Sequence, residues 1–312
     1  LVLDSGQVVS IDYNHIKTHG LPLRFTDEGE GKGMATLADG CTVQCNVVDK
    51  SDMPQAYTSE KIQHYESEPT GTMLKTTGAL PNVSRLNIYT GKDEIRPMMT
   101  GVYFDTNKKV VATDAHKLIY LTEYQNLIEV SQGITLTKAV IKLMEYSSIE
   151  VKTLQSDKKG CKDVVCYADF SDIGVRLGGK FYIDGVYPKY EAVIPSMDSM
   201  TSSITFNRKQ MIEAALKLSK TSPEVKCMDI AFSDDKVRLY AGDIDLKVSM
   251  ELFIDAVKGG SEQFDILFNA LSLADVLKLH SDTQATIYMS APIRAAIIGT
   301  DALLMPVMKS KM

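Results

Sequence analysis

Residues 101–121 read GVYFDTNKKVVATDAHKLIYL, and residues 228–251 read MDIAFSDDKVRLYAGDIDLKVSME. In both segments, apolar and polar residues alternate over short stretches, and polar turn residues separate these stretches. Alternation with a period of two is typical of β-strands, so each segment predicts three consecutive strands. Because the same plan occurs twice, the chain is expected to contain an internal repeat.

Amphipathic segments beside the two copies predict helices. Between Lys138 and Tyr146 the apolar residues fall on one side, after a threonine that can cap the helix. Asn269 is expected to cap a second helix. Asn207 is expected to cap a third, since Gln210 follows it three residues later.

Hairpins are expected to close each repeated unit, over residues 175–193 in the first copy and 293–308 in the second. The N-terminal part resembles the last half of a further copy. Strands are expected there near residues 23–25 and 34–37, with a hairpin turn at Asp39-Gly40.

The sequence therefore predicts about two and a half copies of one unit. We place the boundaries near residues 60 and 196, which gives a partial N-terminal domain (1–59), a middle domain (60–195) and a C-terminal domain (196–312). The expected fold class is α+β, with mostly antiparallel sheets that carry helices on one side.

The composition is that of an ordinary globular protein. The chain has 312 residues, of which 44% are hydrophobic and 24% charged, so two or three domains are expected. No apolar run approaches the about 18 residues that a membrane helix needs, and no signal peptide pattern is visible. We therefore expect a cytoplasmic protein, and the start at Leu1 suggests a fragment of a longer chain.

The net charge of −6 taken alone argues against a nucleic-acid-binding protein. Net charge is a sum, however, and an acidic outer surface with a basic inner surface stays open. The spacing of the five cysteines matches no zinc site, so reduced thiols and no bound metal are expected.

Three segments carry a family resemblance: VVATDAHKL at 110–118, YPKYEAVIP at 187–195 and ALLMPVM at 302–308. In this order and at these separations they are similar to the bacterial DNA polymerase sliding clamp, the beta subunit of DNA polymerase III. The resemblance covers about residues 65–312 as a second and third domain. The N-terminal piece is similar to the second half of a first domain, and the first half of that domain has no counterpart. Ala115 stands where the family has glycine.

The resemblance implies a ring of repeated clamp domains, with antiparallel sheets outside and helices around a central hole. In the family two chains close head to tail around double-stranded DNA, which is bound without regard to sequence. The clamp is not an enzyme and needs no cofactor. It tethers the replicative DNA polymerase and the clamp loader, which insert short linear motifs into a hydrophobic pocket.

By position, the resemblance also implies which residues line this peptide pocket. Methionine and leucine walls can accept differing anchors because their side chains repack readily. Asn269, His116 and Lys117 are expected to fix the peptide at the rim. The full expected lining is Met99, Thr113, Ala115, His116, Lys117, Leu118, Pro188, Val193, Asn269, Ile293, Leu303, Leu304, Met305, Pro306 and Val307.

DNA is expected to contact lysine and arginine side chains on the helices and on one loop, without base recognition. The segment 208–220 is the clearest candidate, since it holds four cations and one acid in an otherwise acidic chain. The candidates are Lys92, Arg96, Lys138, Lys142, Arg208, Lys209, Lys217, Lys220 and Lys278.

An enzyme is the disfavoured alternative. Asp114 and His116 would face the same way on a strand and could form an acid–base pair or bind a metal. No third ligand accompanies them at a known spacing, and the chain contains no phosphate loop, nucleophile elbow or zinc-protease motif.

A second alternative is a clamp-derived protein–protein adaptor that no longer encircles DNA. The incomplete first domain favours this alternative, because in the family the first domain of one chain pairs with the third domain of the other.

Overall fold

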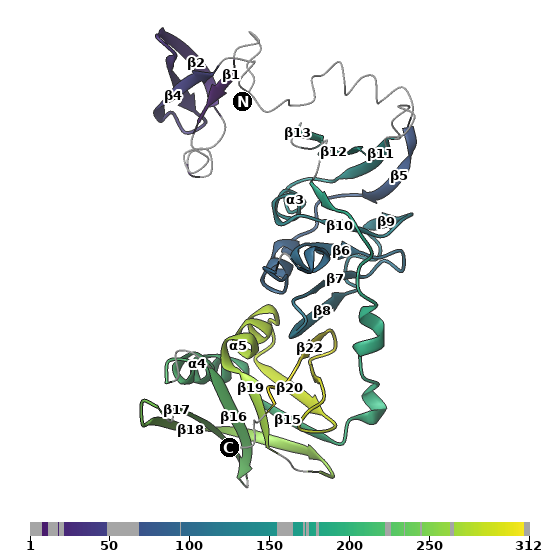
Figure 1. Cartoon of the computed structure of the whole chain (residues 1–312), viewed down its shortest axis with the longest axis vertical. Coiled ribbons are helices and arrows are strands. Elements are labelled where there is room, and N and C mark those ends of the chain that lie inside the picture. Colours follow the sequence, from purple (N-terminus) through teal and green to yellow (C-terminus); the bar gives the residue numbers. More distant parts are fainter. Residues whose placement is uncertain are drawn as a thin grey trace. The chain divides into compact units, whose positions relative to one another are not determined.

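The computed structural model describes residues 8–11, 18, 22–48, 69–93, 95–154, 165–170, 172, 175–178, 181–221, 226–233, 235–243, 245–262 and 265–308. The chain divides into two compact units, Leu1–Ser67 and Glu68–Met312. Figure 1 shows both units, each of which we describe by itself. The further division near residue 196 stays a prediction. For description, we call residues 69–195 the middle segment and residues 196–308 the C-terminal segment.

The first unit contains a four-stranded antiparallel sheet in the order β1-β4-β3-β2. Its strands are β1 (Val8–Ser10), β2 (Pro22–Gly29), β3 (Lys32–Leu37) and β4 (Thr42–Val48). The expected turn at Asp39-Gly40 is confirmed, with Gly40 at a φ of 89° and its N–H donating to the Leu37 oxygen at 2.9 Å. Ala35 and Cys45 form the buried core of this sheet.

The second unit is built around a 13-stranded sheet that runs through both of its segments. Every neighbouring pair in it is antiparallel. In spatial order the strands are β14 (Tyr182–Ile183), β10 (Ile134–Leu136), β6 (Val102–Phe104), β7 (Val110–Thr113), β8 (Lys117–Leu121), β22 (Ala302–Leu304), β21 (Ala296–Ile298), β20 (Gln284–Met289), β15 (Ser202–Asn207), β18 (Val248–Gly260), β17 (Lys236–Asp243), β16 (Cys227–Ser233) and β19 (Ile266–Asn269).

The predicted repeat is confirmed by two three-stranded meanders, β6-β7-β8 and β16-β17-β18. A second, five-stranded sheet completes the middle segment, with β13 (Val175–Gly178), β12 (Val165–Phe170), β11 (Glu150–Leu154), β5 (Pro69–Thr76) and β9 (Ile128–Val130).

Of the two predicted closing hairpins, one is confirmed and one is wrong. β21 and β22 pair as the expected second hairpin. In the first copy, β13 pairs with β12 and β14 pairs with β10. β13 and β14 therefore belong to two different sheets, where the sequence predicted one hairpin.

The helices of the second unit are α3 (Lys138–Leu143), α4 (Arg208–Leu218) and α5 (Ala270–Leu279), and its 3₁₀ helices are η1 (Val83–Ile88), η2 (Pro97–Thr100), η4 (Tyr190–Val193) and η5 (Met197–Ser199). Figure 1 shows α3, α4 and α5 on one side of the large sheet, as predicted for the α+β class. Asn207 accepts from the Gln210 N–H at 3.1 Å, and Asn269 from the Ser272 N–H at 3.0 Å, which confirms both predicted caps.

The helix predicted for residues 138–146 ends at Leu143. The Tyr146 N–H donates to the Leu143 oxygen at 3.0 Å, which tightens the last turn. Ser148 then turns its N–H to the Asp172 carboxylate at 2.7 Å, so the chain leaves the helix there.

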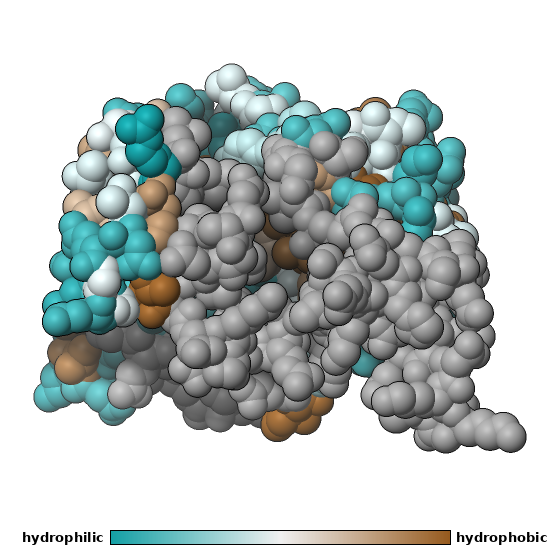
Figure 2. Space-filling view, turned by 90° about the horizontal axis from the view of Figure 1, so that it is seen from above, coloured by the Kyte–Doolittle hydropathy of each residue, from teal (hydrophilic) through white to brown (hydrophobic). Residues whose placement is uncertain are grey.

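Within the described ranges, no helix is long and apolar enough to span a membrane. On the face that Figure 2 displays, the coloured residues are mostly hydrophilic, and the hydrophobic ones form small separate patches.

Candidate functional site

The turn between β7 and β8 is held by its own side chains. Asp114 Oδ1 accepts from the N–H groups of His116 at 2.9 Å and Lys117 at 2.8 Å. Thr113 Oγ1 donates to the Lys117 oxygen at 2.9 Å and accepts from the Ala115 N–H at 3.1 Å. Ala115 has a φ of 74°, a left-handed conformation that favours glycine. These bonds fix the turn in one conformation.

The C-terminal strand joins this turn from the far end of the chain. In the β8–β22 pairing, Leu303 lies opposite Leu118 and Leu304 opposite Lys117. The Met305 N–H then donates to the His116 oxygen at 2.8 Å. Two of the segments quoted above, which are nearly 200 residues apart, therefore lie side by side.

The third segment packs on the same face through its tyrosines. Tyr187 stacks on Tyr103 with 4.4 Å between ring centroids. The Tyr190 hydroxyl donates to Asp105 at 2.6 Å, and burial together with this carboxylate raises the pKa of Tyr190. One buried apolar cluster joins the three segments and consists of Val111, Leu118, Tyr187, Tyr190, Ile297 and Leu303.

The predicted peptide-pocket residues fall into three groups by exposure. The buried ones are Thr113, Lys117, Leu118, Leu303 and Leu304, the half-buried ones are Met99, Pro188, Asn269, Pro306 and Val307, and the exposed ones are Ala115, His116, Val193, Ile293 and Met305. Val193 is 57% exposed, Ile293 64% and Met305 40%. The predicted lining thus combines buried leucines with exposed apolar side chains.

Contacts place most of these residues around the β8–β22 junction. Met99 lies beside the turn, since a Cβ on Gly91 would be 3.7 Å from the Met99 Cβ and 3.9 Å from the Asp114 Cα. The Val307 N–H donates to the Leu267 oxygen at 2.7 Å, next to Asn269.

Val193 and Ile293 lie at the margin of this group. Their near neighbours in sequence, Ile194 and Ala295, pack against the buried apolar cluster. We refer to the exposed members of the predicted lining, Ala115, His116, Val193, Ile293 and Met305, as the apolar groove, after the pocket that the family resemblance implies.

The prediction that Lys117 lies at the rim is wrong. Its side chain is only 8% exposed, and its Nζ lies 3.2 Å from Asp275 Oδ2 and 3.9 Å from Asp114 Oδ2. Nζ also lies 5.7 Å from the centroid of the Tyr89 ring. The side chain points inward because Asp114, Asp275 and the Tyr89 ring surround its ammonium group. Lys117 is therefore a buried neighbour of the exposed residues Ala115 and His116.

Sequence reasoning missed Asp275 and Tyr103. Asp275 is the only acidic residue in α5, whose other residues are mostly apolar, and this is a signal that could have been noticed. Tyr103 carried no such signal, because alternation along β6 predicts only that it lies on one face of the sheet.

The predicted DNA-contacting cations differ in their surroundings. Lys92, Lys142, Lys209, Lys217 and Lys220 are exposed. Others have partners: Arg96 pairs with Asp93 at 3.4 Å and Lys278 with Asp275 at 3.6 Å. Burial and the nearby charge of Lys92 lower the pKa of Lys138.

Arg208 differs from the other candidates because its guanidinium is used inside the protein. Nε donates to the Asp282 oxygen at 2.6 Å, and Nη1 donates to the Leu277 oxygen at 3.2 Å. The Leu277 carbonyl lies in the last turn of α5 (Ala270–Leu279), where a cation also complements the helix dipole, and Asp282 lies just beyond the helix. The structure therefore gives Arg208 a helix-capping role.

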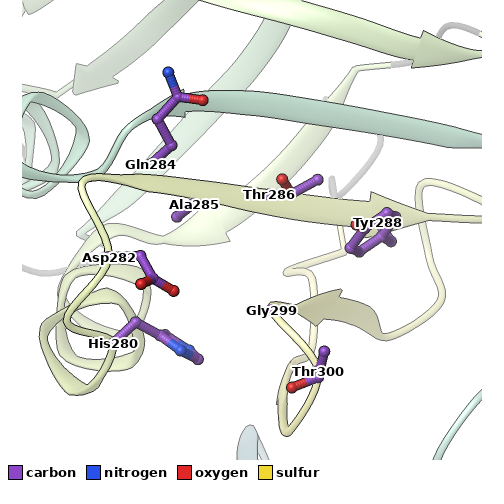
Figure 3. A pocket seen from close by; sticks show the side chains of 8 residues that line it. All are labelled: His280, Asp282, Gln284, Ala285, Thr286, Tyr288, Gly299 and Thr300. Atoms are coloured by element: carbon purple, nitrogen blue, oxygen red, sulfur yellow. The ribbon is translucent and has the colours of Figure 1, made fainter.

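A separate cavity of about 170 Å³ lies between the end of α5, β20 and the β21–β22 turn. Figure 3 shows the His280 and Asp282 side chains on one side of it and Thr286 and Tyr288 along β20. A Cβ on Gly299 would lie 2.9 Å from the His280 ring, so the glycine there allows close packing. No predicted site residue lines this cavity.

Comparison with known proteins relates this geometry to one fold. No protein-family model and no curated protein matches the sequence. The structure is similar to a DNA polymerase sliding clamp from Pseudomonas aeruginosa solved with a ligand, at 16% identity and a TM-score of 0.65, over 91% of this chain and 76% of that chain. It is also similar to the DNA polymerase III beta subunit from Thermotoga maritima, at 15% identity and a TM-score of 0.67, over 92% of this chain and 76% of that chain. A sliding clamp from Pseudomonas aeruginosa bound to griselimycin gives 16% identity and a TM-score of 0.65, over 90% of this chain and 74% of that chain. The chain therefore has the fold of the bacterial DNA polymerase III beta sliding clamps.

Proposed function

We propose that this protein is a DNA sliding clamp, a non-catalytic processivity factor of the cytoplasmic replication machinery. It would form a homodimeric ring around duplex DNA and bind the DNA polymerase and the clamp loader through the apolar groove. The observation that carries the proposal is the meeting of three distant segments at the β8–β22 junction, within a sliding-clamp fold.

The groove has the properties that a short linear motif requires. Exposed apolar side chains, Val193, Ile293 and Met305, offer contacts to aliphatic and aromatic anchors. Leu118 and Leu303 belong to the buried apolar cluster, against which Ile194 and Ala295, the near neighbours of Val193 and Ile293, pack. Such a site is expected to bind with about micromolar affinity, roughly −8 kcal/mol, which lets partners exchange.

The proposed DNA contacts are few and loose. Lys209, Lys217 and Lys220 on or next to α4 are exposed, as are Lys92 and Lys142 in the middle segment. Contacts of this kind neutralise phosphates without reading bases, and they weaken steeply with salt. Ring topology, more than affinity, would then hold the protein on DNA.

A topological retention assay tests the proposal. The protein is loaded with a clamp loader on a nicked circular plasmid and passed over a sizing column in about 0.2 M salt, where direct charge contacts are weakened. Retention on the circle, followed by loss when a restriction enzyme linearises it, is the result expected for a ring.

Light scattering and peptide titration complete the test. A dimer that is retained on the circle supports the clamp. Peptide binding without retention or dimerisation would instead favour the adaptor, since the groove would work while encirclement failed. Absence of both activities would contradict the proposal.

A further inference from the structure

We propose that Asp275, on α5, is a positioning residue that holds the groove turn in its peptide-binding shape by way of Lys117. This inference rests on the proposed function, since it concerns the same groove. Asp275 itself lies on a helix of the C-terminal segment, whereas the turn belongs to the middle segment.

The first step is the environment of Lys117. A buried ammonium needs compensating partners, because it has left its water shell. Asp275 Oδ2 at 3.2 Å is its nearest carboxylate oxygen, and Asp114 Oδ2 is more distant at 3.9 Å. The Tyr89 ring covers another side. Asp275 therefore supplies the main partner, and Asp114 alone would hold the ammonium less tightly.

The second step is the path from Lys117 to the groove. Its N–H donates to Asp114 and its carbonyl accepts from Thr113, so the Lys117 backbone closes the turn. The same turn presents the His116 oxygen to the Met305 N–H. A shift of the Lys117 side chain would therefore displace two groove residues, His116 and Met305.

The third step separates the contact of Asp275 with Lys117 from its contact with Lys278. Asp275 Oδ1 also lies 3.6 Å from Nζ of Lys278, a half-exposed cation on the same helix. The Lys278→Ala variant removes this outer partner and leaves the Lys117 contact in place. It is thus a matched control for any effect of altered charge on α5.

The experiment measures binding of a fluorescein-labelled hexapeptide that ends in Leu-Phe, by fluorescence anisotropy, to the full chain. Asp275→Asn is expected to weaken binding by about tenfold, the loss typical for a hydrogen bond to a charged group. Lys278→Ala is expected to bind like the wild type. Asp275→Glu is expected to recover most of the affinity, because it restores a carboxylate within reach of Lys117.

Amide chemical shifts report the turn itself. In Asp275→Asn without peptide, the resonances of His116 and Met305 are expected to move, whereas those of β12, in the five-stranded sheet, stay. If Asp275→Asn does not fold, the His116 and Met305 resonances of Asp275→Glu, in which the carboxylate is displaced, are compared with those of Lys278→Ala. Shifts in Asp275→Glu alone support the inference, and unchanged shifts in both variants overturn it. Equal affinities and unchanged His116 shifts in folded Asp275→Asn would overturn it. Failure of the wild type to bind the peptide would instead count against the proposed function.

Discussion

The middle and C-terminal segments share one strand plan but differ in their helices. In the C-terminal segment, α4 has 11 residues and α5 has 10, and an asparagine side chain caps each. In the middle segment, α3 has six residues and no side-chain cap bond, and η1 is a 3₁₀ helix whose N-cap residue, Asn82, has a φ of 60°.

This difference teaches that the sheet and the helices depend on different local signals. Strand alternation alone is enough to build β6-β7-β8 and β16-β17-β18 alike. Helix length depends on the ends: an extended asparagine at the N-cap satisfies the first free N–H groups, and a left-handed one does not. The helices that we propose to face DNA are therefore longer and more regular in the C-terminal segment than in the middle segment.

The largest expected effect comes from breaking the junction between the two segments. Leu304 is 1% exposed and lies opposite Lys117 across the β8–β22 pair. Leu304→Ala leaves a cavity there and is expected to lower the free energy of unfolding by about 3 kcal/mol. Urea denaturation followed by circular dichroism measures this change. A loss below about 1 kcal/mol would mean that the junction relaxes to fill the gap.

The second-largest expected effect is a loss of peptide affinity at the apolar groove. Met305→Ala removes an apolar side chain that is 40% exposed and leaves its backbone bond to His116 in place. Peptide affinity is expected to fall about tenfold, which corresponds to the burial of a few methylene groups, with an unchanged melting temperature. Met308→Ala is the matched control, since Met308 is also exposed and lies in the same tail. Equal losses in both variants would argue against the proposed groove.

Much of the fold could be predicted because strand alternation and asparagine caps are local signals. The meanders, the β21–β22 hairpin and the caps at Asn207 and Asn269 follow from such signals. The pairing of β13 and β14 in two different sheets could not be predicted, because alternation does not say which strand will be the neighbour.

The candidate site could be predicted only in part. Its three segments were found through a family resemblance, and the structure brings them together. The inward turn of Lys117 depends on Asp275, 158 residues away. Only the three-dimensional structure brings these two charges into contact, so no local pattern could show that Lys117 is buried.

A third prediction sharpens the contrast between the helices. Asn269→Ala removes the cap of α5 and is expected to destabilise the protein by about 1 kcal/mol. Thr137→Ala in the middle segment is expected to change stability by less than about 0.5 kcal/mol, because the Thr137 side chain makes no cap bond. Urea denaturation of both variants gives the comparison. Equal costs would show that the two helices depend on their caps alike.

The smallest expected change in stability concerns the last turn of each meander. Ala115 between β7 and β8 has a φ of 74°, and Lys247 between β17 and β18 has a φ of 52°. Both are left-handed, which strains any residue other than glycine, although glycine also loses more backbone entropy on folding. Ala115→Gly and Lys247→Gly are therefore each expected to stabilise the protein by about 0.5 kcal/mol, as small rises in melting temperature would show.

The two variants should differ in binding, because only the first turn carries the groove. Ala115→Gly also frees the turn in the unbound state, but four hydrogen bonds from Thr113 and Asp114 still hold it. Peptide affinity is thus expected to stay within about twofold of the wild type in both variants. A clear loss of affinity in Ala115→Gly alone would mean that the strained alanine itself keeps His116 in place. The left-handed turn would then differ in role between the two copies of the repeat.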